Sequence, residues 1–259
     1  MSWMTDWSPG AYERTAVQLG PVADVAVDAA DVQTGDRVLD VACGTGNALL
    51  AAAARGAWVS GIDLAPRLVE VARERAARAG VEADLRVGDA TALPFDDRVF
   101  DAAISVFGVI FAAPARDAAS ELLRVVRTGG RIVVTAWVPE GPIYEAGQLA
   151  RRAVDELSGS AAEPLRNPSW GDPDELSALF APATLRITEQ HLAFTAPSPN
   201  AWIDDQLDHH PLWIGVTQAL GERMAAVREE VIGLMTEGNE DPRAFRTTSR
   251  YRVVHVNVP

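Results

Sequence analysis

The run of ten residues at positions 38–47 constrains the fold of this chain more than any other stretch. It starts with apolar residues typical of a strand that is covered on both faces, reaches an acid, and turns through two glycines into an alanine-rich segment that favours a helix. Gly44 and Gly46 allow the backbone to turn tightly and to approach a ligand. We therefore expect a strand, a ligand-binding loop and a helix of an α/β fold. The residues of this stretch that we expect to meet the ligand are Asp40, Ala42, Cys43, Gly44, Thr45 and Gly46.

The acid at the end of the strand discriminates between two kinds of cofactor. A dinucleotide would bring its pyrophosphate against this loop, where the carboxylate of Asp40 repels it. Ala48 and Leu49 follow the loop, so the third glycine of the dinucleotide fingerprint is absent. A ligand that carries an ammonium group and no phosphate is instead attracted by Asp40, and S-adenosylmethionine is such a ligand.

Two further acids stand at the ends of the next two expected strands. Asp63 follows the segment 57–62, where a carboxylate is placed to accept hydrogen bonds from both hydroxyls of a ribose. Leu64, the next residue, is a further expected contact of the same ligand. Asp89 and Ala90 follow the segment 83–88, where an acceptor can take the amino group of an adenine. Three acids at three successive strand ends favour an adenosine-containing ligand.

With these motifs, the chain resembles the class I S-adenosylmethionine-dependent methyltransferases from about Asp36 to Trp137. It is most similar to their small-molecule branch, which includes the quinone-pathway C-methyltransferases. The resemblance implies an α/β fold with a Rossmann-like, seven-stranded, mostly parallel sheet, helices on both faces, an N-terminal helical lid and a helical insertion before the last strand. It also implies methyl transfer to an O, N or C atom of a small-molecule acceptor. The segments that carry it are LDVACGTG at 39–46, GIDL at 61–64, GDATALPF at 88–95 and LRVVRTGG at 123–130.

The length of 259 residues and the alternation of strand and helix patterns predict a single domain over residues 1–259. Its expected parts are an N-terminal helical lid at 1–34, a cofactor-binding core at 35–138, and a C-terminal sheet edge at 139–259 that carries a helical substrate cap at 198–238. A turn is expected at 169–173, a helix capped by Asp172 after it, and the last two strands at 185–195 and 251–258. In the resembling family these two strands pair at one edge of the sheet.

Aromatic residues at both ends of the cofactor core leave two interpretations open. Trp3, Trp7 and Tyr12 begin the lid, and the resemblance implies that Tyr12 covers the methionine end of the cofactor. Packing of these rings onto the sheet is an equal alternative. Ser105, Val106 and Phe107 follow the expected fourth strand and should line the methionine half of the site, although Phe107 is equally suited to the core.

The insertion contains His209 and His210, which are candidates for a catalytic base, with Asp204 and Asp205 nearby. The alternative is that two adjacent histidines before Pro211 simply end a helix. Methyl transfer from an activated sulfonium mainly needs alignment, so the catalytic residue stays unknown. Neighbouring histidines point in different directions on a helix, and no metal site is expected.

The amino-acid composition excludes several classes of substrate and partner. The net charge of −13 disfavours nucleic acid as a substrate. All 23 basic residues are arginine, which excludes a lysine Schiff base and suggests a bacterial source.

Cys43 is the single cysteine, and its place by the cofactor favours the role of a small residue over that of a nucleophile. The sequence shows no leader or membrane span, so we expect a cytoplasmic protein without a membrane partner. The run Arg73–Arg75 indicates a solvated helix face.

Two rival functions remain at this point. A nicotinamide-dependent oxidoreductase shares the glycine loop, although Asp40 and Asp89 disfavour it. A non-catalytic S-adenosylmethionine-binding partner protein would keep all three acids and lack only the acceptor site. The sequence indicates neither the acceptor nor the oligomeric state.

Overall fold

The structure is a computed structural model that describes residues 6–159 and 170–259. Trp3 of the expected lid and Ser169 of the expected turn lie outside the described residues.

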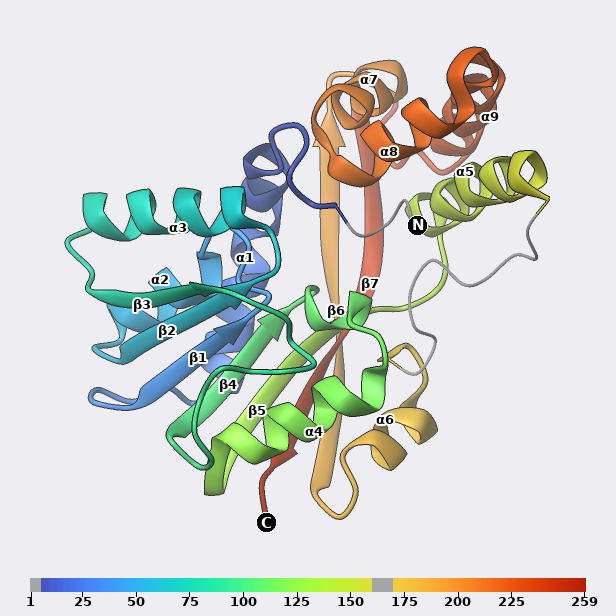
Figure 1. Cartoon of the computed structure of the whole chain (residues 1–259). Helices are drawn as coiled ribbons and strands as arrows, with labels where there is room; N and C mark the ends of the chain where they lie inside the picture. The colour runs from blue at the N-terminus through green and yellow to red at the C-terminus, as the bar shows by residue number, and fades with distance from the viewer. Residues whose placement is uncertain (1–5, 160–169) are drawn as a thin grey trace. The chain divides into compact units, whose positions relative to one another are not determined.

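Within the described residues, seven strands form one sheet in the order β3-β2-β1-β4-β5-β7-β6 (Figure 1). The neighbours from β3 to β5 pair in parallel, whereas β7 pairs antiparallel with β5. This topology places the carboxyl ends of the first five strands at one edge. The strands are β1 Arg37–Val41, β2 Trp58–Asp63, β3 Ala83–Val87, β4 Phe100–Val106, β5 Val126–Trp137, β6 Thr184–Ala196 and β7 Phe245–Asn257.

Helices connect the strands, and Figure 1 shows α2 and α3 on one face of the sheet and α4 and α6 on the other. As expected, Asp172 caps α6 by accepting hydrogen bonds from two backbone N–H groups. Short 3₁₀ turns lie at Val109–Phe111 and Gly221–Arg223. The helices are α1 Glu13–Ala29, α2 Asn47–Ala54, α3 Pro66–Arg78, α4 Ala115–Val125, α5 Pro142–Ser158, α6 Pro173–Leu179, α7 Pro199–His209, α8 Pro211–Leu220 and α9 Met224–Glu237.

The structure confirms the expected fold class: a mostly parallel Rossmann-like sheet, an N-terminal helix and a helical insertion between β6 and β7. The start expected for the last strand was wrong: this strand begins at Phe245 and not at Tyr251. In β7, buried Phe245 and Thr247 alternate with exposed Arg246, and the polar residues hide this strand pattern in the sequence.

The chain divides into two compact units. The first, here the helical unit, comprises residues 6–18, 138–159 and 191–250 of the described chain. The second, here the sheet unit, comprises residues 19–137, 170–190 and 251–259. The organisation as a single domain stays a prediction.

The helical unit has its own apolar core, built from α5, α7, α8, α9 and the start of β7. Trp202 is 4% exposed, and its ring centroid lies 5.8 Å from that of Phe245. Trp213 is buried in the same core. The two tryptophans of the insertion therefore pack its interior, which is the structural alternative to their lining an acceptor pocket.

We expect Trp202→Ala to lower the free energy of unfolding by about 3–5 kcal/mol, because the truncation leaves a large cavity in this core. Trp58→Ala is the matched control, since Trp58 is 67% exposed on β2, and we expect it to change stability by no more than about 0.5 kcal/mol. Thermal and urea denaturation of both variants measure the difference. Equal losses would contradict the packing role of Trp202.

Candidate functional site

The expected site residues of the sheet unit gather at the carboxyl ends of its parallel strands. Asp40 is the fourth of five residues in β1, and Asp63 ends β2. Asp40 pairs with Gly61 of β2 and with Ile104 of β4, so it stands between two neighbouring strands. Phe107 directly follows β4. This edge is where open α/β sheets bind their ligands.

Asp40 is a buried carboxyl group whose negative charge the protein stabilises only in part. It is 2% exposed, and the backbone N–H of Leu49 at the start of α2 donates to its Oδ2 over 2.9 Å. Burial is the main cause that raises the pKa of Asp40 to about 7; the Leu49 hydrogen bond acts against this rise, and the charge of Asp63 adds to it. A cationic group bound beside Asp40 would favour the ionised carboxylate.

Asp63 ties the glycine loop to the end of β2. Its Oδ2 accepts the backbone N–H of Gly44 over 2.8 Å, and its Oδ1 accepts that of Ala65 over 2.9 Å. Burial raises the pKa of Asp63 despite these bonds. Each carboxylate oxygen has a second lone pair, so Asp63 can still accept hydrogen bonds from a ligand.

The loop between β1 and α2 has an unusual backbone. Ala42, Gly44 and Gly46 have φ values of 54°, 53° and 82°, all in the left-handed region. A Cβ atom at Gly46 would lie 3.3 Å from the Cβ of Ala72, so α3 packs closely on this turn. A positive φ at a non-glycine residue such as Ala42 costs energy and is enriched at ligand sites. Burial raises the pKa of the Cys43 thiol, which is unsuited to a nucleophile.

Arg75 supports the loop from α3, which the sequence analysis did not predict. One of its guanidinium nitrogens (Nη1) donates to the carbonyl of Thr45 over 2.7 Å and to the Thr45 hydroxyl over 2.8 Å. The same nitrogen reaches Oδ1 of Asn47 over 2.8 Å. The interpretation of Arg73–Arg75 as a solvated helix face was therefore wrong for Arg75, whose partners come from tertiary packing.

Ser105 and Phe107 connect the end of β4 to its neighbours. The hydroxyl of Ser105 donates to the carbonyl of Val41 over 2.7 Å and accepts the N–H of Val109 over 3.0 Å. The N–H of Phe107, which has a φ of 57°, donates to the buried hydroxyl of Thr135 over 3.0 Å. These bonds fix the backbone next to the glycine loop. Val106 between them is half-buried.

An aromatic cluster of Phe107, Trp137 and Tyr251 lies at the same edge of the sheet unit. The rings of Phe107 and Trp137 are stacked, with centroids 3.7 Å apart and planes 5° apart. Tyr251 meets both rings edge to face, at 5.5 Å and 6.0 Å. Trp137 is the last residue of β5, and Phe107 is the first residue after β4. Two aromatic residues at corresponding strand ends are the sequence signal from which this cluster could have been predicted.

Two of the expected adenosine contacts lie at exposed positions. Asp89 is exposed, and its Oδ1 accepts the N–H of Thr91 over 2.8 Å. Leu64, after Asp63, is 53% exposed, and Ala90 has intermediate exposure. A ligand can reach all three residues without a rearrangement of the core.

Tyr12, His209 and His210 belong to the helical unit. The ring centroid of Tyr12 lies 6.0 Å from that of His210. Nδ1 of His209 lies 3.1 Å from the carbonyl oxygen of Asp205, which can only accept, so Nδ1 carries a proton and the neutral ring has its lone pair on Nε2. Nδ1 of His210 instead accepts the N–H of Leu212 over 3.2 Å. Of the two histidines, only His209 has the tautomer of a base at Nε2.

Within residues 6–159 and 170–259, no group of three His, Cys, Asp or Glu residues is arranged to hold a metal ion. Among the helices of the same residues, none has the length and apolar character to cross a membrane.

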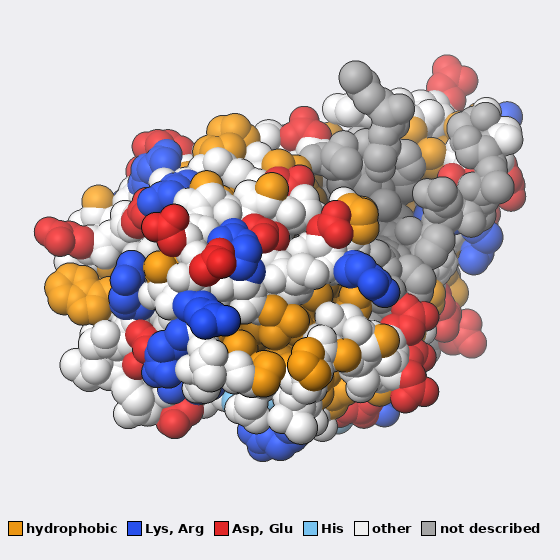
Figure 2. All heavy atoms as spheres, turned by 60° about the horizontal axis from the view of Figure 1, so that its bottom comes forward, with side chains coloured by type: hydrophobic (Ala, Val, Ile, Leu, Met, Phe, Trp, Pro, Cys, Tyr) orange, Lys and Arg blue, Asp and Glu red, His pale blue; other side chains and the backbone are white. Residues whose placement is uncertain are grey.

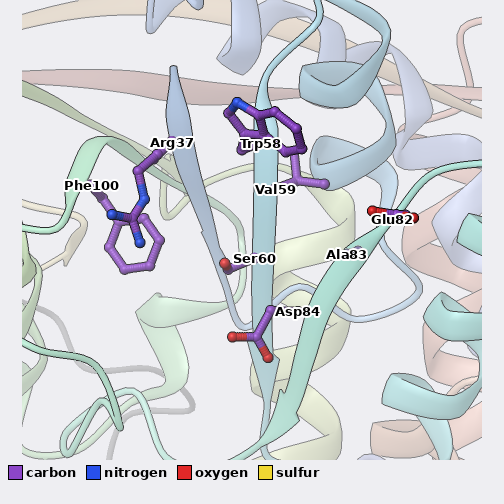
Figure 3. Close-up of a pocket in the computed structure, with 8 residues that line it drawn as sticks. All are labelled: Arg37, Trp58, Val59, Ser60, Glu82, Ala83, Asp84 and Phe100. Atoms are coloured by element: carbon purple, nitrogen blue, oxygen red, sulfur yellow. The ribbon is translucent and has the colours of Figure 1, made fainter. Parts of the chain in front are cut away.

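A hollow of about 400 Å³ lies at the opposite end of the strands from the acids (Figure 3). Its walls come from the first residues of β1 to β4 and the residue before β3, and Trp58 is its large exposed side chain. Since ligands of parallel sheets bind at the carboxyl ends, this hollow is not part of the candidate site.

Comparisons with known proteins agree with this geometry. Residues 38–130 match the family model of a methyltransferase domain. The demethylmenaquinone methyltransferase of Clavibacter sepedonicus is 35% identical over 216 residues, which cover 76% of this chain and 86% of the relative. An uncharacterized protein of Mycobacterium tuberculosis is 40% identical over 67% of this chain, and the match spans 63% of that relative's length. A putative methyltransferase from Bacillus halodurans has the same fold, with a TM-score of 0.63, 21% identity and coverage of 92% of this chain and 98% of its own.

The chain belongs to the class I S-adenosylmethionine-dependent methyltransferases. S-adenosylmethionine is the cofactor of this family.

We expect Arg75→Met to loosen the glycine loop, because the loop loses charge-assisted hydrogen bonds worth roughly 1.5–3 kcal/mol each. Arg78→Met is the control on the same helix, since Arg78 pairs only with exposed Glu74 among its described ion pairs. Hydrogen exchange measured by mass spectrometry on the peptide that contains residues 43–47 should accelerate at least about tenfold in the first variant alone. An unchanged exchange rate in Arg75→Met would remove Arg75 from the support of the loop.

Proposed function

We propose that this protein transfers the methyl group of S-adenosylmethionine to a small-molecule acceptor. The observation that carries the proposal is the buried carboxyl of Asp40, whose raised pKa and position beside a left-handed glycine loop suit a cationic ligand. Membership of the methyltransferase family supports the same assignment.

The proposed cofactor site extends along the carboxyl ends of the first four strands. Asp40 attracts the ammonium group of the methionine moiety, Asp63 accepts the ribose hydroxyls, and Asp89 accepts the adenine amino group. The glycine loop brings backbone close to the cofactor. The remaining proposed contacts are Tyr12, Ala42, Cys43, Gly44, Thr45, Gly46, Leu64, Ala90, Ser105, Val106 and Phe107.

S-adenosylmethionine supplies a methyl group on a positively charged sulfur, which is already activated for displacement. An acceptor nucleophile would displace the sulfur from the methyl carbon, with the carbon–sulfur electron pair leaving on sulfur, and the acceptor would release its proton to a base or to water. The protein then mainly needs to hold the nucleophile in line and to exclude water, which can lower the barrier by about 7–11 kcal/mol. Where the acceptor needs a base, the tautomer of His209 suits the task and that of His210 does not.

A planar, quinone-like or aromatic metabolite is the proposed acceptor class. The relative from Clavibacter sepedonicus is a demethylmenaquinone methyltransferase. Support from the structure comes from Trp137 at the carboxyl end of β5, which is half-buried and stacks on the buried ring of Phe107, since aromatic rings favour flat, apolar ligands.

The net charge and the single cysteine support two further proposals, one on partners and one on location. We propose that nucleic acid is not a substrate, because the net charge is −13 and Figure 2 shows arginine side chains interspersed with acidic ones on the face that it draws. A cytoplasmic location is proposed from the single, buried cysteine.

Calorimetric titration with S-adenosylhomocysteine, with NADH as the comparison ligand, tests the cofactor. Saturable binding of the first and none of the second supports the proposal, and the reverse result would establish the nicotinamide alternative. Turnover of quinols, phenols and amines, followed as release of S-adenosylhomocysteine, then distinguishes an enzyme from a non-catalytic binding protein.

The affinity for S-adenosylhomocysteine should depend on pH through Asp40. With a pKa of about 7 in the free protein, Asp40 is neutral at lower pH, and the ligand's ammonium group can pair with it only after the proton leaves. The dissociation constant should therefore be nearly flat above pH 7 and rise about tenfold per pH unit well below it. Titrations between pH 5 and 8.5 measure this.

Asp40→Asn is the control for the pH dependence. Its amide oxygen can still accept the Leu49 N–H, but the side chain carries no charge. We expect weaker binding that no longer changes through pH 7. A wild-type curve that is equally flat would show that Asp40 does not meet the ammonium group.

A further inference from the structure

Residues 6–12, here the N-terminal strap, lie against the junction of α7 and α8 within the helical unit. The N–H of Ala11 donates to the carbonyl oxygen of His209 over 2.9 Å. Two residues after the strap, Arg14 forms a 2.6 Å ion pair with Asp205 of α7. The first described residues of the chain and the helical insertion are thus joined through polar contacts, although some 200 positions separate them.

The strap passes so close to α7 that one of its positions requires glycine. Gly10 has a φ of 73°, and a Cβ atom there would lie 2.3 Å from the carbonyl oxygen of His209 and 2.5 Å from Cδ1 of Ile214. A side chain at this position would need both an unfavourable backbone conformation and a displacement of the strap. The close approach is therefore a specific feature of this sequence.

Three aromatic rings connect the strap to the helix junction. The ring centroids of Trp7 and Tyr12 lie 5.7 Å apart, and His210 lies 6.0 Å from each of them. All three pairs are edge-to-face, with interplanar angles of 82°, 69° and 71°. His210 is the member of the cluster that comes from the insertion.

His210 has a second, separate task at the helix junction. It stands between α7 and α8, and its Nδ1 caps α8 by accepting the N–H of Leu212. The neutral ring therefore carries its proton on Nε2. Although the residue as a whole has intermediate exposure, burial of its ring lowers the pKa of His210 to about 4. A ring that stays neutral and already uses Nδ1 is suited to hold neighbours in place and unsuited to accept a proton.

We propose that His210 is a positioning residue that holds the N-terminal strap on the α7–α8 junction and thereby orients the ring of Tyr12. The inference rests on the proposed function, because Tyr12 is a cofactor contact there. In this proposal His210 holds the strap and does not act as a base. The strap and the insertion then behave as one piece, and cofactor affinity depends on how well the strap is held.

Two substitutions separate the two tasks of His210. His210→Asn keeps an acceptor that caps α8 and removes the ring, because asparagine is among the best N-cap residues. His210→Phe keeps the ring and removes the acceptor. The ring contacts are the feature that the proposal needs, so the first variant should affect function and the second should affect stability.

The measurements are the hydrogen-exchange rate of residues 6–12, the dissociation constant of S-adenosylhomocysteine, the melting temperature and kcat. For His210→Asn we expect faster exchange of the strap and, if about one molecule in ten keeps the strap in place, about tenfold weaker binding, with little change in melting temperature. For His210→Phe we expect wild-type exchange and affinity with a lower melting temperature, since α8 loses its N-terminal cap.

Two outcomes would overturn the proposal. One is strap exchange and affinity in His210→Asn equal to those of the wild type. The other is a loss of kcat of similar size in both variants at unchanged affinity, as a general base would give.

Gly10→Ala is a second route to the same question if His210→Asn does not fold. It displaces the strap without touching His210, and it should reproduce the faster exchange and weaker binding. Unchanged affinity with a displaced strap would also contradict the proposal. A wild-type protein that does not bind S-adenosylhomocysteine contradicts the proposed function instead, and strap exchange still reports on the contact between His210 and the strap.

Discussion

The bonds between buried carboxylates and backbone N–H groups fix the edge of the sheet on which the rest of the candidate site depends. Asp63 accepts the N–H groups of Gly44 and Ala65, and Asp40 accepts that of Leu49. These bonds satisfy the N–H group of Gly44 in the left-handed loop and two N–H groups at the starts of α2 and α3, which have no partner inside their own helices. They also bring two negative groups into a buried region, and burial raises the pKa of both. The loop geometry therefore comes with a preference for a cationic ligand.

The sequence predicted this part well because its signals are local. A buried strand, an acid and two glycines in one run specify the loop without knowledge of distant residues, and the strands that end near Asp63 and Asp89 follow the same pattern. The start of β7 was mispredicted because Arg246 and Arg250 interrupt its apolar pattern. Arg75 was missed for a different reason: its partners lie about 30 positions away, and only the packing of α3 on the loop brings them together.

The two adjacent histidines show where residue chemistry stops being predictive. In sequence they are equivalent candidates for a base, but the hydrogen-bond partner of Nδ1 differs between them. Nδ1 of His209 donates to a backbone carbonyl oxygen, whereas Nδ1 of His210 accepts from a backbone N–H group. The partner fixes the tautomer, and the tautomer decides whether Nε2 accepts or donates. The sequence-based alternative that these residues end a helix also describes the structure, since α7 ends at His209 and His210 caps α8.

The two units solve different physical problems. In the sheet unit, parallel strands align their carboxyl ends, so a cofactor site can be assembled from short local motifs. In the helical unit, the buried tryptophans of the insertion form a core, and segments from distant parts of the chain converge on the α7–α8 junction. Changes in the insertion therefore alter the surroundings of the strap, whereas the carboxylates and the glycine loop of the sheet unit depend on contacts within that unit.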